Sequence, residues 1–322
     1  MMKLIADIFL KELKLKSAGE VGLDALDDGA TISIGDKTLV LTTDSHTVKP
    51  LFFPGGDIGK LAVAGTINDL AVMGARPLAM ASAMVLEEGF SLDDLTKITR
   101  SMDATAREVG CPLITGDLKV MEHGALDGAV ITTTGVGVAE TLVTDRGLRP
   151  GDEIIVTGTI GDHGMTILAH REGIAVDMNL ESDVAPIWET IEAALEMGGI
   201  TAMKDPTRGG LAAALDEMAS KAEVGIILRE SDIPIAEAVR AMGEMLGIDP
   251  LQITNEGKAV IAVDPAKSQE VLAAIRKTKY GRKASIVGEV TKNHPKNVLL
   301  ETVVGGRRLL ESPIGDPAPR IC

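Results

Sequence analysis

The first 140 residues of the chain alternate between apolar runs with the period of a strand and longer runs with helical spacing. We expect strands at 31–34 and 37–45, joined by a turn, and at 77–89, 112–117 and 128–140, with helices at 57–74 and 91–110. Ser91 is a suitable N-cap for the second helix, because Asp93 and Asp94 follow in its first turn. The order β-β-α-β-α-β-β predicts a domain of mixed α/β (α+β) class.

The second half begins with turn residues at 146–152 and again mixes helices and strands. We expect helices at 185–199, 205–222 and 233–247, a hairpin at 251–264 around the turn Asn-Glu-Gly-Lys, and further elements at 271–278, 283–290 and 298–308. A chain of 322 residues exceeds what one hydrophobic core usually spans. The predicted units are therefore domains at 1–145 and 146–311 and a flexible tail at 312–322.

Composition limits the possible partners. The net charge is −15 and aromatic residues make up 2%, which argues against binding nucleic acid. Two cysteines exclude a disulfide framework and fit a reducing cytoplasm. Charged residues interrupt every apolar run near the N-terminus, so residues 1–19 are predicted to be an amphipathic helix rather than a signal peptide. No apolar run is long enough for a membrane span, and we expect a cytoplasmic protein.

The tail carries one of the two cysteines, Cys322, at the end of the sequence Gly-Asp-Pro-Ala-Pro-Arg-Ile-Cys. Prolines stiffen such a segment into an extended form. A terminal thiol is either an accidental feature of a fraying end or a carrier that moves between an active site and a partner. Arg320 is a candidate for lowering the pKa of the thiol.

Aspartates stand at the ends of several predicted elements. An apolar strand that ends in an aspartate brings a carboxylate to the edge of a sheet, where ligands often bind. Carboxylates that converge repel one another unless a cation neutralises them, and Mg²⁺ with phosphates prefers such oxygen ligands. Each aspartate could equally be an ordinary turn or cap residue. The candidate metal ligands are Asp28, Asp44, Asp69 and Asp117.

The segment Asp-Pro-Thr-Arg-Gly-Gly at 205–210 precedes a predicted helix. Backbone N–H groups, the positive end of the helix dipole and a guanidinium would form a phosphate cradle there. The alternative is a helix cap with a glycine turn. Two other glycine-rich segments, 54–61 and 134–140, fail the P-loop and dinucleotide patterns.

Two further residues are candidates for proton transfer. Glu256 lies in the turn Asn-Glu-Gly-Lys, where partial burial would raise its pKa and make it a base, although exposure to solvent is equally compatible with the local sequence. His163 lies in Gly-Asp-His-Gly and is either a ligand or proton donor or a surface loop residue.

Several of these strings together resemble one family. Residues 42–75, Glu-Glu-Gly at 87–89, Thr-Gly-Asp-Leu-Lys-Val at 115–120, residues 158–164, 204–213 and 246–258, and the terminal Pro-Arg-Ile-Cys are similar to the hydrogenase maturation proteins of the HypE (carbamoyl dehydratase) family. The terminal motif is the most specific element. The sister families, aminoimidazole ribonucleotide synthetase, selenophosphate synthetase and thiamine-monophosphate kinase, lack it.

The resemblance implies an N-terminal domain that forms a homodimer and binds ATP with Mg²⁺, and a C-terminal α+β domain. It implies that the carbamoyltransferase HypF loads a carbamoyl group onto the terminal cysteine. ATP-dependent dehydration to a thiocyanate then provides cyanide, which passes to iron on the HypC–HypD complex for the [NiFe] hydrogenase centre. A selenophosphate synthetase-like enzyme and a non-catalytic docking partner are the alternative functions.

The resemblance also implies roles for individual residues. Cys322 is the expected carrier, Glu256 the proton acceptor and Lys119 an active-site residue. The expected ATP site comprises Lys60, Asn68, Thr115, Gly116, Asp205, Thr207, Arg208 and Gly209. The sequence departs from the family in two ways: Leu118 replaces a usual threonine, and Met1 begins at the first predicted helix, without the His-Gly-x-Gly-Gly-type segment that usually precedes it.

Overall fold

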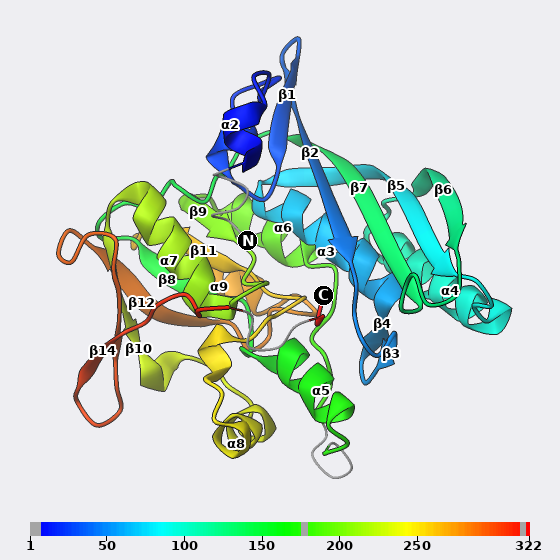
Figure 1. Ribbon diagram of the computed structural model, residues 1–322. Coiled ribbons are helices and arrows are strands. Elements are labelled where there is room, and N and C mark those ends of the chain that lie inside the picture. The colour runs from blue at the N-terminus through cyan, green and yellow to red at the C-terminus, as the bar shows by residue number, and fades with distance from the viewer. Residues whose placement is uncertain (1–7, 175–179, 316–319) are drawn as a thin grey trace.

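The computed structural model describes residues 8–174, 180–315 and 320–322, which form two domains, each built on one sheet (Figure 1). The N-terminal sheet has the strand order β1-β2-β7-β5-β6 and is antiparallel except for the parallel pair β5–β6. Its strands are β1 (Ala30–Ile34), β2 (Lys37–His46), β5 (Ala75–Glu87), β6 (Leu113–Met121) and β7 (Ala129–Ala139), and β3 (Phe52–Phe53) and β4 (Gly56–Asp57) form a separate ribbon. The predicted order of long strands and helices in this half is confirmed.

Two helices, α3 (Ile58–Val72) and α4 (Leu92–Val109), lie on one side of this sheet (Figure 1). The Asp57 carboxylate caps α3 by accepting from two backbone N–H groups, and the predicted Ser91 cap of α4 is confirmed. Every residue of α3 is buried except Lys60 and Asp69. A helix that is apolar nearly all round packs on several sides. The two partly exposed residues lie at opposite ends of the helix, Lys60 in its first turn and Asp69 in its last.

The N-terminal sheet has an inner face against the helices and an outer face away from them. Along β7 the buried residues alternate with partly exposed ones, among them Thr132, Thr134 and Val136 on the outer face. The predicted strand 77–89 lies largely within β5, which shows a similar alternation. Its outer-face residues are small or exposed because no helix packs on that side (Figure 1).

The C-terminal domain contains a seven-stranded sheet in the order β14-β13-β10-β12-β8-β11-β9. Its strands are β8 (Glu153–Val156), β9 (Ile200–Lys204), β10 (Gly225–Arg229), β11 (Val260–Val263), β12 (Ser285–Thr291), β13 (Val298–Glu301) and β14 (Arg307–Leu309). Its helices are α5 (Asp162–Arg171), α6 (Trp188–Met197), α7 (Gly210–Ala222), α8 (Glu237–Leu246) and α9 (Ser268–Ile275). The predicted helices within 185–199 and 233–247 are confirmed.

The predicted hairpin at 251–264 is wrong. Only β11 is a strand, and Leu251 lies in a short 3-10 helix, Pro250–Gln252. The side chain of Asn255 explains the difference, because it donates to the Pro206 carbonyl at 3.0 Å and accepts from the Gly161 N–H at 2.7 Å. Side-chain bonds of this kind replace the ladder that a strand would need.

Two other expectations need correction. Helix α7 begins at Gly210 with Gly209 as its N-cap, not at Asp205, because a turn in which the Gly210 N–H bonds to the Thr207 carbonyl precedes it. Of the predicted N-terminal helix, residues 1–7 lie outside the described residues. In the described part, helical conformation ends with α2 (Leu10–Glu12), and residues 13–19 of the predicted helix are not helical. Across the described segments, no helix combines the length and apolarity needed to cross a membrane.

Asn68 on α3 joins the two domains. Its side-chain amide donates to the backbone carbonyls of Ala185 and Glu256, each at 3.1 Å, and accepts from the Ile187 N–H at 2.9 Å. Asn68 is 2% exposed, so water cannot replace these bonds. The chain segment that carries Glu256 is therefore tied directly to the central helix of the other domain.

Replacing Asn68 with alanine should destabilise the protein by about 2–4 kcal/mol, because three buried backbone groups lose their partner. Urea unfolding followed by circular dichroism measures this loss. Asn293→Ala, at an exposed loop position, is the matched control and should change stability by less than about 0.5 kcal/mol. Equal effects of the two variants would show that Asn68 does not join the domains.

Candidate active site

The end of the chain lies between the two domains, close to α3 and α5 (Figure 1). Ile321 is 3% exposed and belongs to the core around α3 and α5. Its carbonyl oxygen lies 2.9 Å from Nε2 of His163, and the Cys322 carbonyl accepts from Thr47 Oγ1 at 3.4 Å. The Cys322 side chain lies beside the carboxylate of Glu256, where hydrogen bonding between the two acts to lower the pKa of Glu256. The tail is thus docked, with its thiol directed into the protein.

Glu256 is not an exposed turn residue. It is 3% exposed, and its backbone N–H donates to Asp183 Oδ1 at 3.1 Å. Burial raises the pKa of Glu256 well above its ordinary value, and the nearby carboxylates of Asp205, Asp44 and Asp183 raise it further. Among the described residues, its Oε1 atom has no hydrogen-bond partner. The carboxyl group beside the thiol is therefore suited to accept a proton.

Four aspartates form a second group next to Glu256. Asp28 precedes β1, Asp44 lies on β2, Asp69 on α3, and Asp205 follows β9, so both domains contribute. Burial raises the pKa of Asp69 and of Asp205 well above the ordinary value, and the neighbouring aspartates add to the effect. Three of the four candidate metal ligands, all except Asp117, are thereby brought together.

A buried lysine, Lys204, lies among the carboxylates of this region. The Nζ atom of Lys204 lies 2.6 Å from Asp28 Oδ1 and within 3.6 Å of Asp145 and Glu217. Burial alone would lower the pKa of Lys204, but these carboxylates hold it well above its ordinary value. Lys204 was not among the predicted site residues, although it immediately precedes the Asp-Pro-Thr-Arg-Gly-Gly segment.

Asp44 differs from its neighbours. Burial acts to raise its pKa, but His46, the Ser45 N–H and Arg208 outweigh that effect and lower the pKa. Nε2 of His46 lies 3.2 Å from Asp44 Oδ2, and an added Cβ at Gly65 would lie 2.8 Å from that nitrogen. Gly65 therefore leaves the space in which the imidazole reaches Asp44.

The aspartate group fits Mg²⁺. All of its donor atoms are carboxylate oxygens, and Oδ2 of Asp28 is buried without a hydrogen-bond partner among the described residues. Within the described ranges, no three His, Cys, Asp or Glu side chains form a ready-made metal site. Mg²⁺ usually binds one or two carboxylates together with phosphates and water, so the arrangement suits a cation that arrives with a nucleotide.

Asp117 and Lys119 lie elsewhere, on β6, where they form an ion pair of 2.9 Å. Across the sheet, Asp44 pairs with Thr133, Thr133 with Ser82 and Ser82 with Gly116. Three strand spacings make roughly 14 Å. Because side chains alternate along a strand, Asp117 is directed to the outer face, whereas Asp44 is on the inner face. Within a single chain, Asp117 and Lys119 therefore lie away from the aspartate group.

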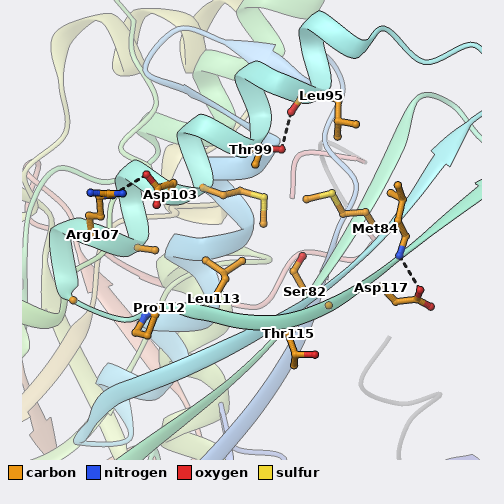
Figure 2. Close-up of a pocket in the computed structure, with 15 residues that line it drawn as sticks. Ser82, Met84, Leu95, Thr99, Asp103, Arg107, Pro112, Leu113, Thr115 and Asp117 are labelled. Carbon is orange, nitrogen blue, oxygen red and sulfur yellow. Dashed lines mark hydrogen bonds and ion pairs between the residues drawn. The ribbon is translucent and has the colours of Figure 1, made fainter.

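A groove of about 1120 Å³ lies between α4 and the β5–β6 edge (Figure 2). Its lining is mainly apolar and includes Met84 and Leu113, and Thr115, Gly116 and Asp117 stand at its β6 side. In Figure 2, Ser82 and Leu113 point toward α4 and Thr115 points away from it. The groove has the size and character of a small-molecule site.

The remaining predicted site residues divide between the two domains. Lys60, in the first turn of α3, donates to the Gly55 carbonyl at 2.9 Å. Thr207, Arg208 and Gly209 precede α7, and the charge of Arg208 reaches Asp44. Arg320 points away from the thiol, since its guanidinium donates to Asp127 at 2.7 Å.

Comparison with known proteins gives consistent results. Residues 26–139 match the family model "AIR synthase related protein, N-terminal domain", and residues 149–300 match the corresponding C-terminal domain. The carbamoyl dehydratase HypE of Azotobacter vinelandii is 46% identical, over 100% of this chain and 94% of the relative.

Solved structures are similar over the same length. A HypE in a HypE–HypF complex has a TM-score of 0.90 at 40% identity, over 96% of this chain and 99% of the other. A HypE in complex with ATP has a TM-score of 0.86 at 38% identity, over 100% and 96%. With both domains matched and this identity along the whole chain, the protein belongs to the carbamoyl dehydratase HypE family of AIR synthase related proteins.

Proposed function

We propose that the protein dehydrates a carboxamide carried on its own Cys322 to a thiocyanate, using ATP, and so supplies the cyanide ligand of the [NiFe] hydrogenase iron centre. The observation that carries this proposal is the contact between the Cys322 thiol and the buried Glu256. A docked thiol with a basic carboxyl group beside it is the arrangement that a tethered substrate requires.

The reaction removes one oxygen atom and two protons from the group S–C(=O)–NH₂ and leaves S–C≡N. The amide oxygen is a poor leaving group, so it departs as phosphate after phosphorylation at the expense of ATP. Glu256 accepts one N–H proton as the carbon–nitrogen multiple bond forms, and its raised pKa suits that step. The second N–H proton leaves with the released phosphate. The low exposure of Glu256 keeps water from the reactive group.

The aspartate group is also the proposed site for the metal ion and the nucleotide phosphates. We propose that Asp28, Asp44, Asp69 and Asp205 hold Mg²⁺ together with the phosphates, with Arg208 close by. The metal supplies charge neutralisation for phosphoryl transfer. The related HypE in complex with ATP supports nucleotide binding by this fold.

The partners follow from the chemistry of the tail. The donor of the carbamoyl group is proposed to be HypF, a choice that the related HypE–HypF complex supports. The acceptor is proposed to be iron on the HypC–HypD complex, in the cytoplasm. Both partners require the tail to leave its docked position, and residues 312–322 reach about 3 Å per residue when extended.

We further propose a homodimer that uses the outer face of the N-terminal sheet. Asp117 and Lys119 lie on that face and away from the aspartate group of their own chain. A second copy packed there would cover the half-exposed side chains of β7 and bring β6 of one chain toward the site of the other. The predicted active-site role of Lys119 depends on this arrangement.

Replacing Glu256 with glutamine should stop the reaction after loading. With HypF, carbamoyl phosphate and ATP, mass spectrometry of the C-terminal peptide should show a carbamoyl group and then loss of water. In Glu256→Gln the loss should be at least about 100-fold slower, with loading unchanged. The wild-type rate should rise with pH through the raised pKa of Glu256, because only the ionised carboxylate accepts a proton.

Cysteine variants supply the control. Cys322→Ala should abolish loading, whereas Cys111→Ala, at a buried position in the N-terminal domain, should leave it intact. Normal water loss in Glu256→Gln would refute its role as base, and loading without any loss of water in the wild type would favour a docking protein.

Replacing Asp69 with asparagine should stabilise the metal-free protein, by about 2–4 °C in melting temperature. The raised pKa of Asp69 means that the folded state binds protons more tightly than the unfolded state, so metal-free stability falls as pH rises, and less so in the variant. Mg²⁺ with ATP should stabilise the wild type but not the variant. The exposed Asp36→Asn is the matched control, and equal Mg²⁺ effects in all three proteins would contradict the site.

Replacing Thr134 with arginine should dissociate the dimer, because it places a charge on the outer face. Light scattering should give twice the chain mass of 33.7 kDa for the wild type and the single mass for the variant. Thr96→Arg, on the exposed side of α4, should remain dimeric. A monomeric wild type would rule out the proposed dimer.

A further inference from the structure

The docked tail is held by a chain of hydrogen bonds whose direction is fixed by chemistry. The Ile321 carbonyl oxygen can only accept, so Nε2 of His163, 2.9 Å away, carries the ring proton. Nδ1 of the same ring is then an acceptor, and Ser182 Oγ donates to it at 2.7 Å. Ser182 Oγ itself accepts from the Val184 N–H at 3.0 Å. Each group therefore donates to the next, from the Val184 N–H through Ser182 and His163 to the Ile321 carbonyl.

The surroundings of His163 fix the orientation of its imidazole ring. It is fully buried in the first turn of α5 and packs edge-on against Phe53, with ring centroids 5.4 Å apart. Burial lowers the pKa of His163, so the neutral ring keeps one donor and one acceptor nitrogen. Both nitrogens are engaged away from the Cys322 thiol, so the predicted catalytic role of His163 has no support in this geometry.

The side chain of Ile321 is fixed as well. It lies in the core with Met165 and Ile253. An added Cβ at Gly164 would lie 3.5 Å from Ile321 Cδ1 and 2.3 Å from Ile253 Cγ2, so the glycine leaves room for both side chains. With its side chain and its carbonyl both held, Ile321 determines where the next residue, Cys322, is placed.

We propose that Ser182 and His163 are positioning residues that hold the Ile321 carbonyl and thereby set the Cys322 thiol against Glu256. Ser182 was not among the predicted site residues, and no sequence pattern marks it. This proposal rests on the proposed function, because a thiol that carries the substrate between partners must return to one position beside Glu256 after each visit.

Thiol alkylation of the full-length chain tests the proposal. The sequence has two cysteines, and the other, Cys111, is fully buried with its pKa raised to about 11, so iodoacetamide reports on Cys322. Ser182→Ala and His163→Phe should each raise the alkylation rate about five- to tenfold, because each breaks a buried hydrogen bond. The exposed Ser231→Ala should react like the wild type.

A conservative variant separates hydrogen bonding from packing. His163→Gln retains a side-chain N–H that can reach the Ile321 carbonyl, so its alkylation rate should stay near that of the wild type. If the glutamine variant reacts as fast as His163→Phe, or if Ser182→Ala reacts like the wild type, the proposal is wrong. A wild-type rate equal to that of a free Arg-Ile-Cys peptide would also overturn it. Because the assay contains no ATP or HypF, absence of dehydratase activity would not affect its result.

Discussion

The burial of several carboxylates at one junction between two domains is the constraint on which the site depends. Asp44 and Asp69 come from one domain and Asp205 and Glu256 from the other, and burial, together with repulsion between neighbouring carboxylates, raises the pKa of Asp69, Asp205 and Glu256. Such an arrangement costs stability. Hydrophobic packing around α3, the Asn68 bridge and the ammonium group of Lys204 offset that cost.

The same junction receives the end of the chain. Ile321 enters the core between α3 and α5, and Cys322 meets Glu256. Because the buried Ile321 anchors the neighbouring Cys322, the tail has a defined resting position. The ion pair of the preceding residue, Arg320, with Asp127 lies at the exposed surface. Docking and release can therefore be controlled at different points, the buried anchor setting position and the surface contact responding to partners and salt.

Much of the architecture could be predicted from local pattern. The strands β2 and β7, the helices α6 and α8 and the Ser91 cap depend mainly on neighbours within a few residues, and these predictions are confirmed. The hairpin at 251–264 was mispredicted because the side chain of Asn255 bonds to loops more than 40 residues away in the chain. No local pattern carries information of that kind.

The sequence by itself determined the residue types of the site and their order: aspartates after apolar strands, a glycine-rich helix start and a terminal cysteine. Only the tertiary structure decided which of them meet. It buried Glu256, joined Asp28, Asp44 and Asp69 to Asp205, and set Asp117 and Lys119 on the opposite face of the sheet. The physical reason is that pKa, burial and proton transfer depend on distances between segments far apart in the chain, which packing alone establishes.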